Sequence, residues 1–341
     1  MFTSVLGSIS PEMAIDPGTS TTRILVAGRG VVCQEPSVVA IHEDRQGRRR
    51  LLAVGAEALA MEGRTPRDIR VVRPLSGGAI TDFEILEAML RELMHRVQGR
   101  RLFVGPRVTI AVPHGITEVE RRALRESVEA SGAREVVHVE QPLAAAAGCG
   151  LPIDDACGFM VVDVGAAITT VSVLSLGGVV YSRTLAVGGD AMDQAIARHV
   201  RERFDLLIPR SVAEEVRKSL GSVMPGMPVA TRLVRGRHLD SGYPRLAELD
   251  SDGVRIALQQ PVGLIAEAVL ETLERTPPDL AADIAETGVV LVGGAAHLPG
   301  LDRAVGDGAG LPAVVPEDPE LCVVRGAAEL MGVAALGRAA G

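Results

Sequence analysis

The sequence predicts an α/β fold of two similar domains that flank a cleft. The chain has 341 residues, more than one compact core usually contains, so two domains are expected. Val-rich runs that end in glycine turns alternate with segments of helical periodicity, as in sheets covered by helices. A strand–turn–strand pattern that begins with aspartate occurs twice, near the start and near the middle of the chain. The two parts are therefore expected to share one architecture, with a ligand cleft between them.

The first of these patterns lies near the N-terminus. Residues 13–15 form a short apolar run that ends at Asp16. A Pro-Gly pair and the hydroxyl residues 19–22 follow, and residues 23–26 begin the next strand. Small residues and hydroxyls permit a tight turn, so this segment is predicted as a hairpin with an aspartate at its entrance.

Two helices and a strand are expected between the hairpins. Asp82 precedes residues 83–97, whose apolar side chains recur on one helical face, so it is expected to cap that helix. Residues 108–112 are predicted as a buried strand. Thr117 and Glu120 form the capping-box pattern of a further helix.

The second pattern repeats the first. The apolar run 159–162 ends at Asp163, Gly165 opens a turn of small residues, and residues 171–174 continue as a strand. Asp190 is expected to cap the helix after this hairpin, because apolar residues recur four positions apart behind it.

A third polar turn is expected near the C-terminus. The apolar strand 289–292 leads into Gly293 and Gly294 and then into a helix near 301–305. Earlier in the chain, the stretch 210–261 is more polar and contains several prolines, so we interpret it as an inserted subdomain with loops.

These three turns together favour a phosphate-binding site. Backbone N–H groups in tight Gly, Ser and Thr turns bind phosphate oxygens, because small residues let the ligand approach the main chain. An aspartate beside each hairpin turn can hold Mg²⁺ through water, since this ion prefers oxygen ligands. The sequence has neither the P-loop lysine motif nor a Gly-x-Gly-x-x-Gly turn after the first strand, so the prediction depends on the duplicated hairpin.

Composition and charge argue against several other classes of protein. Lys and Arg number 35 against 43 Asp and Glu, and aromatic residues make up 2% of the chain, so no nucleic-acid partner is expected. The 4 cysteines contain no Cys-x-x-Cys pair and the histidines are scattered, which argues against a disulfide scaffold or a zinc site. No apolar run is long enough to span a bilayer, and residues 1–10 lack the features of a signal peptide, so a cytoplasmic protein is expected.

The first turn resembles the first phosphate loop of the MreB family, the bacterial actin homologues that determine rod shape. The segments that carry this resemblance are 15–22, 34–40, 63–66, 73–75, 80–83, 112–120 and 187–193. The match runs from about residue 14 to about residue 332. It implies the actin/Hsp70/sugar-kinase fold, ATP or ADP with Mg²⁺ in the cleft between the domains, and self-assembly into protofilaments. It also implies a location at the inner face of the cell membrane, with the cell-wall synthesis machinery as partner.

The resemblance also implies which residues form the site. Asp16 and Asp163 would hold Mg²⁺ through water, and Gln141 together with Asp163 would position the attacking water. The nucleotide-binding residues would come from two phosphate turns, an adenosine-contacting segment and an adenine-side turn. They are Gly18, Thr19, Ser20, Gly165, Ala166, Ala167, Glu214, Glu215, Val216, Arg217, Gly293, Gly294, Ala295 and Ala296.

Several residues depart from the family pattern. The second phosphate turn reads Gly165-Ala166-Ala167-Ile168, where the family typically has three glycines and a threonine. The added Cβ atoms are expected to restrict positive φ angles and to crowd the phosphates. Gln141 stands where the family usually has a glutamate, and glutamine cannot act as a base, although actin itself uses glutamine there. Hydrolysis is therefore expected to be slow or lost, which leaves at most a weak ATPase coupled to polymerisation.

Two alternatives to an ATP-dependent filament remain open. One is a nucleotide-insensitive scaffold of the same family, which has lost ATP turnover through its altered second turn. The other is an actin-fold kinase for a small molecule. That kinase would need a substrate-facing catalytic aspartate and a substrate pocket, and the sequence offers no motif for either.

The resemblance and the repeat together suggest domain boundaries. The first domain is expected at 13–145, with a small inserted subdomain at about 33–75. The second is expected at 146–333, with an inserted subdomain at about 190–262. Residues 1–12 form an N-terminal segment that is a candidate for membrane contact, because its apolar residues recur at helical spacing.

Two segments are candidates for membrane contact. Leu102 and Phe103 follow Arg100 and Arg101 after a predicted helix, and MreB proteins carry an apolar membrane-inserting loop at that place. Phe2 belongs to the N-terminal segment, which has no basic residue and is therefore the weaker candidate. The alternative for Leu102 and Phe103 is that they begin the next strand and face the core.

Overall fold

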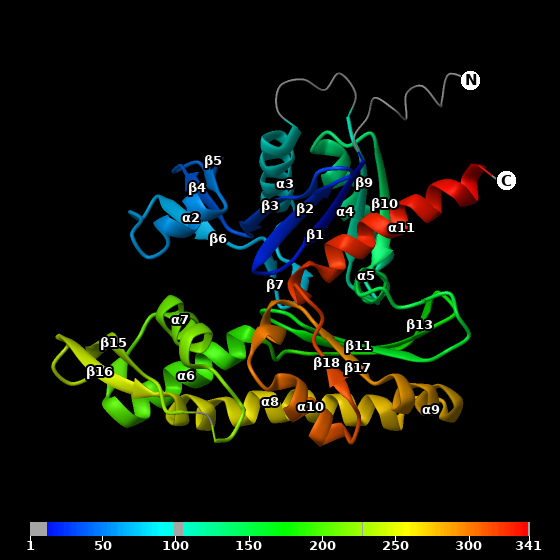
Figure 1. Ribbon diagram of the computed structural model, residues 1–341. Helices are drawn as coiled ribbons and strands as arrows, with labels where there is room; N and C mark the ends of the chain where they lie inside the picture. Colours follow the sequence, from blue (N-terminus) through cyan, green and yellow to red (C-terminus); the bar gives the residue numbers. More distant parts are fainter. Residues whose placement is uncertain (1–11, 99–104, 227, 340–341) are drawn as a thin grey trace. The chain divides into compact units, whose positions relative to one another are not determined.

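The computed structural model describes residues 12–98, 105–226 and 228–339, and it divides into two compact units (Figure 1). Unit 1 comprises Met1–Pro152 and Leu321–Gly341, and unit 2 comprises Ile153–Glu320. Each unit contains a five-stranded sheet, with the order β10-β9-β1-β2-β3 in unit 1 and β13-β12-β11-β17-β18 in unit 2. In both sheets the strand before the Asp-led turn pairs antiparallel with the next strand and parallel with a later one. The expected repeat is therefore present.

The sheet of unit 1 has its first hairpin near the middle. Its strands are β1 (Glu12–Pro17), β2 (Thr21–Val26), β3 (Gly30–Pro36), β9 (Arg107–Val112) and β10 (Glu135–Glu140). Met13 and Ile15 of β1 belong to a core cluster with side chains of the flanking helices. Because side chains alternate along a strand, Ala14 and Asp16 point to the opposite face of the sheet.

Helices cover the sheet of unit 1. They are α3 (Phe83–Gln98), α4 (Glu118–Ala130), α5 (Gln141–Gly148) and α11 (Cys322–Ala339). Both expected caps are confirmed: the Ile85 N–H donates to Asp82 Oδ1 at 3.1 Å, and Thr117 forms a complete capping box with Glu120. Helix α11 contacts β1, β2 and β9, which it crosses in Figure 1.

The close packing of α11 on α5 explains why the units differ from the boundaries expected at 145 and 333. A Cβ atom on Gly148 would lie 1.9 Å from the carbonyl oxygen of Cys322. One on Gly326 would lie 1.8 Å from the carbonyl oxygen of Ala144. Only glycines permit such a close backbone approach, so the C-terminal helix belongs to unit 1.

A small sheet extends from unit 1 in the region expected for the first insertion. Its elements are β4 (Val39–Glu43), β5 (Arg49–Val54), β6 (Ile69–Val72) and α2 (Ala56–Met61), and β7 (Leu75–Ser76) and β8 (Ala79–Ile80) follow it. Val38, Ala40 and Ala58 form a separate small core beneath this sheet. Its folding therefore depends on few apolar contacts of its own.

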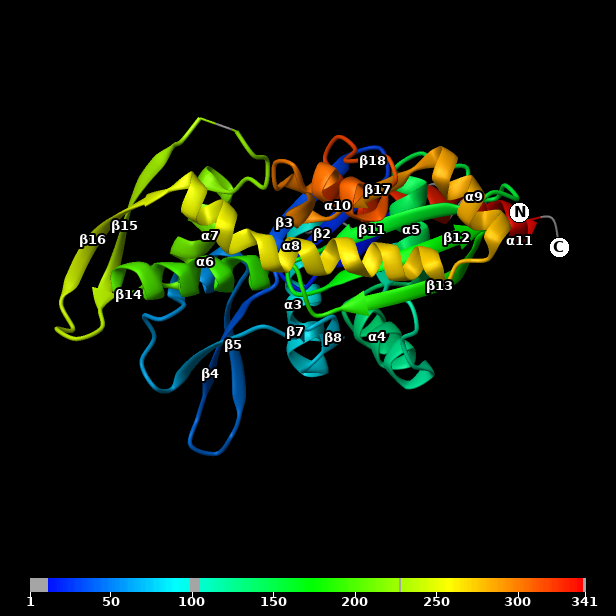
Figure 2. The same ribbon diagram turned by 90° about the horizontal axis from the view of Figure 1, so that it is seen from below.

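A long helix packs along the sheet of unit 2. The strands are β11 (Phe159–Val164), β12 (Thr169–Ser175), β13 (Gly178–Leu185), β17 (Val289–Val292) and β18 (Ala313–Val314). The helices are α6 (Gly189–Phe204), α8 (Ser251–Glu274), α9 (Pro278–Thr287) and α10 (Leu301–Ala309), with short 3-10 turns η2 (Gly294–His297) and η3 (Pro319–Leu321). Helix α8 lies along β12 and β13, as Figure 2 shows.

The second insertion differs from its sequence-based interpretation. It contains β14 (Leu206–Leu207), α7 (Arg210–Leu220), β15 (Thr231–His238) and β16 (Pro244–Asp250), and its last residues, 251–261, belong to helix α8. Val234 and Leu249 of its sheet belong to the main core of unit 2, so this insertion has no separate core among the described residues. The expected cap of α6 is also wrong, because Gly188 is the N-cap and Asp190 lies in the first turn.

Candidate functional site

The first Asp-led turn is held in place by Ser37, the residue that follows β3. The Ser37 hydroxyl donates to the carbonyl oxygen of Gly18 at 2.6 Å and lies 2.8 Å from the hydroxyl of Thr22. The Ser37 N–H donates to the carbonyl oxygen of Ser20 at 2.9 Å. A Cβ atom at position 18 would lie 2.7 Å from the carbonyl oxygen of Thr21, so the tight turn requires glycine. Sequence analysis gave Ser37 no role, although it holds the turn.

Asp16 is a buried carboxylate at the entrance of this turn, with 5% of its surface exposed. Arg23 lies directly opposite it in the β1–β2 register, and Arg23 Nη1 is 3.5 Å from Asp16 Oδ2. Burial raises the pKa of Asp16, and the charge of Arg23 and a hydrogen bond from Gln141 oppose that rise. Arg23 had no predicted role, and the available signal was an arginine directly before the apolar residues 24–26 of β2.

Two neighbouring residues at the start of α5, Gln141 and Glu140, contact different partners. Gln141 is the first residue of α5, and its side chain hydrogen-bonds to Asp16. Glu140, one residue earlier, has its Oε2 atom 3.2 Å from His114 Nδ1. The structure thus brings Gln141, and not Glu140, to the carboxylate that the sequence analysis assigned to the metal.

The second turn is joined to the start of α6 by backbone hydrogen bonds. The Gly189 N–H donates to the carbonyl oxygen of Gly165 at 3.0 Å, and the Asp190 N–H donates to that of Ala166 at 2.8 Å. A Cβ atom on Gly188 would lie 2.6 Å from both carbonyl oxygens. The backbone of the second turn is therefore fixed to the N-terminal end of α6.

The backbone of the second turn agrees with the expected restriction on positive φ angles. Within the described ranges, the only non-glycine residues with positive φ are Leu176, Asp205 and Asp318. Ala166 and Ala167 therefore adopt ordinary backbone angles, and their Cβ atoms cause no positive-φ strain. Crowding of a ligand by these two Cβ atoms stays a prediction.

Arg217 of α7 lies beside the second turn. Its Nε donates to Asp193 Oδ1 at 2.6 Å, and a Cβ atom on Gly189 would lie 3.3 Å from Arg217 Nη2 and 3.8 Å from Ala166 Cα. Asp193 is 2% exposed. Burial raises the pKa of Asp193, and the hydrogen bond and charge of Arg217 oppose that rise. Asp193, which had no role in the sequence analysis, positions the guanidinium.

The other residues of the predicted adenosine-contacting segment point in different directions. The side chain of Val216 is fully buried in the core of unit 2, and a contact of this residue with a nucleotide stays a prediction. Glu215 is exposed, and its Oε2 accepts from Arg232 at 2.6 Å. Glu214 pairs with Lys218 at 2.6 Å. Burial would raise the pKa of Glu214, but the Lys218 hydrogen bond and charge outweigh it and lower the pKa.

The third turn approaches the second hairpin closely. Gly293 has φ +89°, and a Cβ atom there would lie 2.4 Å from Asp163 Oδ1 and 2.5 Å from the carbonyl oxygen of Val164. Gly294 is exposed, whereas Ala295 and Ala296 are buried in the core. The structure therefore brings Gly293 to Asp163, and it places the side chains of the two alanines in the core of unit 2. Their contact with a nucleotide stays a prediction.

The two aspartates fit the expected Mg²⁺ unequally. Among the described residues, no group of three or more His, Cys, Asp or Glu side chains is arranged to hold a metal ion. Asp16 does not fit well, because a guanidinium already lies beside its carboxylate and would repel a divalent cation. Asp163 is only partly buried and fits an oxygen ligand that acts through water.

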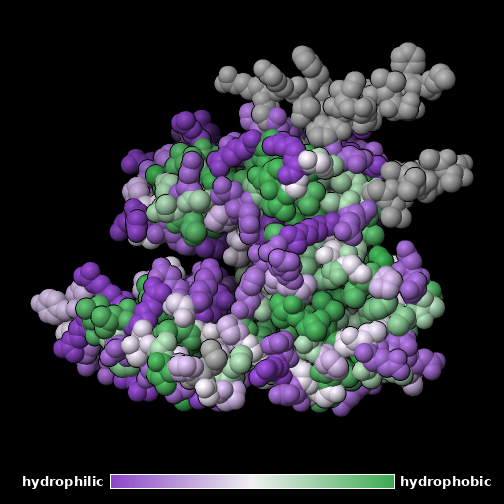
Figure 3. All heavy atoms as spheres, viewed as in Figure 1, coloured by the Kyte–Doolittle hydropathy of each residue, from purple (hydrophilic) through white to green (hydrophobic). Residues whose placement is uncertain are grey.

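The membrane candidates lie outside the described residues. These are Phe2, Leu102 and Phe103. Within the described part of the chain, no helix has the length and apolar character that a membrane span requires. A small exposed apolar patch does occur on β15 and β16, where Leu233 and Leu246 point outward (Figure 3).

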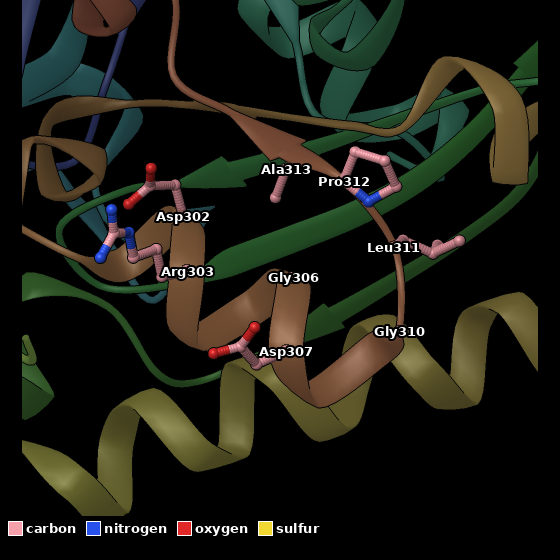
Figure 4. Close-up of a pocket in the computed structure, with 8 residues that line it drawn as sticks. All are labelled: Asp302, Arg303, Gly306, Asp307, Gly310, Leu311, Pro312 and Ala313. Atoms are coloured by element: carbon pink, nitrogen blue, oxygen red, sulfur yellow. The ribbon is translucent and has the colours of Figure 1, made fainter.

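A pocket of about 470 Å³ lies apart from all three turns. Its lining comes from α10 and the segment that enters β18 (Figure 4). Asp302, Arg303 and Asp307 supply its charged groups, and Pro312 lies at its edge. None of the predicted nucleotide-binding residues lines it, so this pocket is not the predicted site.

Comparisons with known proteins agree on one family. A family model described as MreB/Mbl protein matches residues 10–336. The chain is 47% identical over 322 residues to the cell shape-determining protein MreB of Escherichia coli, which covers 94% of this chain and 93% of that protein. It is 40% identical over 315 residues to the cell shape-determining protein Mbl of Bacillus cereus, with 92% and 94% covered.

A solved structure agrees with the sequence comparisons. The crystal structure of MreB5 of Spiroplasma citri bound to AMPPNP matches with a TM-score of 0.91 at 32% identity, over 97% of this chain and 99% of that one. The ADP-bound crystal structure of the same protein matches with a TM-score of 0.90 over the same shares. The likeness therefore extends over both units.

Proposed function

The chain belongs to the MreB/Mbl family of cell shape-determining proteins and has an actin-like fold, and from this premise we propose that it binds ATP and polymerises into filaments. The filaments would lie at the inner face of the cell membrane and organise cell-wall synthesis. Repeated subunits suit this role, because many weak contacts with a surface act together along a polymer.

The observation that carries the proposal is the Asp-led hairpin that recurs at the same place in both sheets. Each turn is held in one conformation by hydrogen bonds from a neighbouring segment, Ser37 in unit 1 and Gly189 in unit 2. Preorganised backbone turns bind phosphate without having to be ordered first. The MreB5 structures with AMPPNP and ADP support the same ligand class.

The predicted site residues of unit 1 and those of unit 2 would have distinct roles. Gly18, Thr19 and Ser20 would offer backbone N–H groups to phosphate oxygens, and Arg217 would add positive charge beside Ala166. Mg²⁺, when bound, would neutralise phosphate charge, and Asp163 is the residue proposed to hold it through water. Gln141 would orient water through its amide, since it cannot accept a proton as a base.

Sedimentation with and without Mg-ATP tests the proposal. We expect the full chain to pellet as filaments when ATP is present and to remain in the supernatant without it. Gly188→Val serves as the matched variant, because its side chain would collide with the carbonyl oxygens of the second turn. That variant should lose the response to ATP. Equal pelleting of the native chain in both buffers would contradict the nucleotide part of the proposal.

A second candidate, a nucleotide-insensitive scaffold, is favoured by the alanines of the second turn. If their Cβ atoms crowd the phosphates, Ala166→Gly combined with Ala167→Gly should bind ATP more tightly, by about tenfold for a gain of 1.4 kcal/mol. Equilibrium titration with a fluorescent ATP analogue measures this. An unchanged dissociation constant would remove the steric explanation, and absence of binding by both proteins would favour the scaffold.

A further inference from the structure

An arginine occupies the centre of the first phosphate hairpin. Arg23 lies on β2, between Asp16 of β1 and Gln34 of β3 in the strand register. Directly opposite residues of antiparallel strands have neighbouring side chains, so the pairing with Asp16 follows from the register itself. The distance of 3.5 Å from Arg23 Nη1 to Asp16 Oδ2 is that of an ion pair.

The position of Arg23 is unfavourable for folding alone. Its side chain is 12% exposed, and its Nε atom is buried without a hydrogen-bond partner. An unpaired buried N–H lowers stability, and a buried charge is tolerated only beside a compensating one. The ion pair with Asp16 is the interaction that offsets this loss of stability.

We propose that Arg23 supplies, beside Asp16, the positive charge that Mg²⁺ would otherwise supply in unit 1. A divalent cation held at Asp16 would lie within a few ångströms of the guanidinium and be repelled by it. Nucleotide binding by this chain then depends less on a divalent cation than it would without Arg23, and the cation that remains would be held by Asp163 in unit 2. Arg23 is in this sense a specificity-determining residue, and the inference rests on the proposed nucleotide binding.

The first test compares nucleotide affinity in Mg²⁺ and in EDTA. A fluorescent ADP analogue is titrated into the full-length native chain, Arg23→Gln and Arg23→Lys. We expect removal of Mg²⁺ to raise the dissociation constant of Arg23→Gln by about tenfold more than it raises that of the native chain. Arg23→Lys keeps the charge and should behave like the native chain.

The second test needs no nucleotide. Electron paramagnetic resonance follows the binding of Mn²⁺ alone to the same proteins. Arg23→Gln should gain a Mn²⁺ site that the native chain lacks, and adding Asp16→Asn to this variant should abolish it. Thermal unfolding of each variant checks that it is folded, and Arg23→Met, which also removes the charge, takes the place of Arg23→Gln if that variant does not fold.

The outcomes separate the two proposals. An equal loss of affinity in EDTA for the native chain and for Arg23→Gln would overturn the role of Arg23 while leaving nucleotide binding intact. A native chain that binds no nucleotide in either buffer would overturn the proposed function. The Mn²⁺ titration would then still decide the charge effect, because no gain of a site in Arg23→Gln contradicts it.

Discussion

The buried pair of Asp193 and Arg217 shows how one residue can control another at the second turn. Asp193 lies on α6, which begins at that turn, and Arg217 lies on α7. Both side chains are largely buried, with exposed fractions of 3% for Asp193 and 11% for Arg217. Losing either partner would leave an uncompensated charge in a region of low polarity.

Asp193→Ala should therefore destabilise the protein by about 3–5 kcal/mol and weaken ATP binding. The guanidinium, once released, would no longer be held beside Ala166. Denaturant unfolding and nucleotide titration measure the two effects. Glu92→Ala is the control, because Glu92 forms an exposed ion pair with Arg96 on α3 that is worth about 0–1 kcal/mol. Equal effects of the two substitutions would refute the positioning role.

At the scale of elements, the packing of α5 against α11 depends on two glycines. Gly326→Ala would place a Cβ atom 1.8 Å from a carbonyl oxygen of α5, so the helices would have to separate. We expect a loss of about 1–3 kcal/mol or more in unfolding free energy. Gly263→Ala in α8 meets nothing within 4 Å and should instead stabilise the protein by about 1 kcal/mol. Denaturant melts compare the two, and a neutral Gly326→Ala would contradict the packing argument.

Strand β10 carries a histidine that makes stability depend on pH. Burial, followed by the charges of Arg125 and Arg121 on α4, lowers the pKa of His138 to about 4, while Glu118 opposes the shift. The unfolded chain binds the proton near pH 6.5 and the folded chain only near pH 4. Between these values the unfolded state binds more protons, so the stabilisation present above pH 6.5 declines as the pH falls.

His138→Gln should remove this contribution, because glutamine does not titrate. Thermal melts at several pH values from 7 to 4 should show a smaller loss of stability for His138→Gln than for the native chain. The quantity compared is the change of melting temperature with pH in the two proteins. The contributions of carboxylates that titrate in both proteins cancel in this comparison. Parallel curves would mean that His138 titrates normally in the folded state.

At the scale of the whole molecule, the proposed membrane association would need a segment that contacts lipid. Leu102 and Phe103 are two large apolar residues beside two arginines. Burying each in acyl chains is worth on the order of 1.5–3 kcal/mol, and each arginine adds about 1 kcal/mol at an anionic surface. One such contact is weak, but a filament presents many at once.

Leu102→Ser combined with Phe103→Ser should therefore give a folded protein that no longer pellets with anionic liposomes. The arginine contribution should weaken as salt is raised, because exposed charges are screened. Phe2→Ser is the matched control for the N-terminal segment. Retained liposome binding by the double variant would shift the role to Phe2 and its neighbours. Aggregation of the double variant would indicate that the two residues face the core.

The sequence by itself determined the features that depend on neighbouring residues. The two Asp-led hairpins, the caps at Asp82 and Thr117, and the glycine turn at Gly293 all follow from local spacing and turn chemistry, and the structure contains each of them. The repeated hairpin also indicated two similar units, because both sheets reuse one order of strands.

Only the tertiary structure decided which side chains meet. Local periodicity could not show that Gln141 contacts Asp16 while Glu140 turns to His114, or that Val216 enters the core. It also could not assign α11 to unit 1, since that depends on glycines about 180 residues apart in the chain. Such contacts arise from packing between distant segments, whose partners a short window of sequence does not contain.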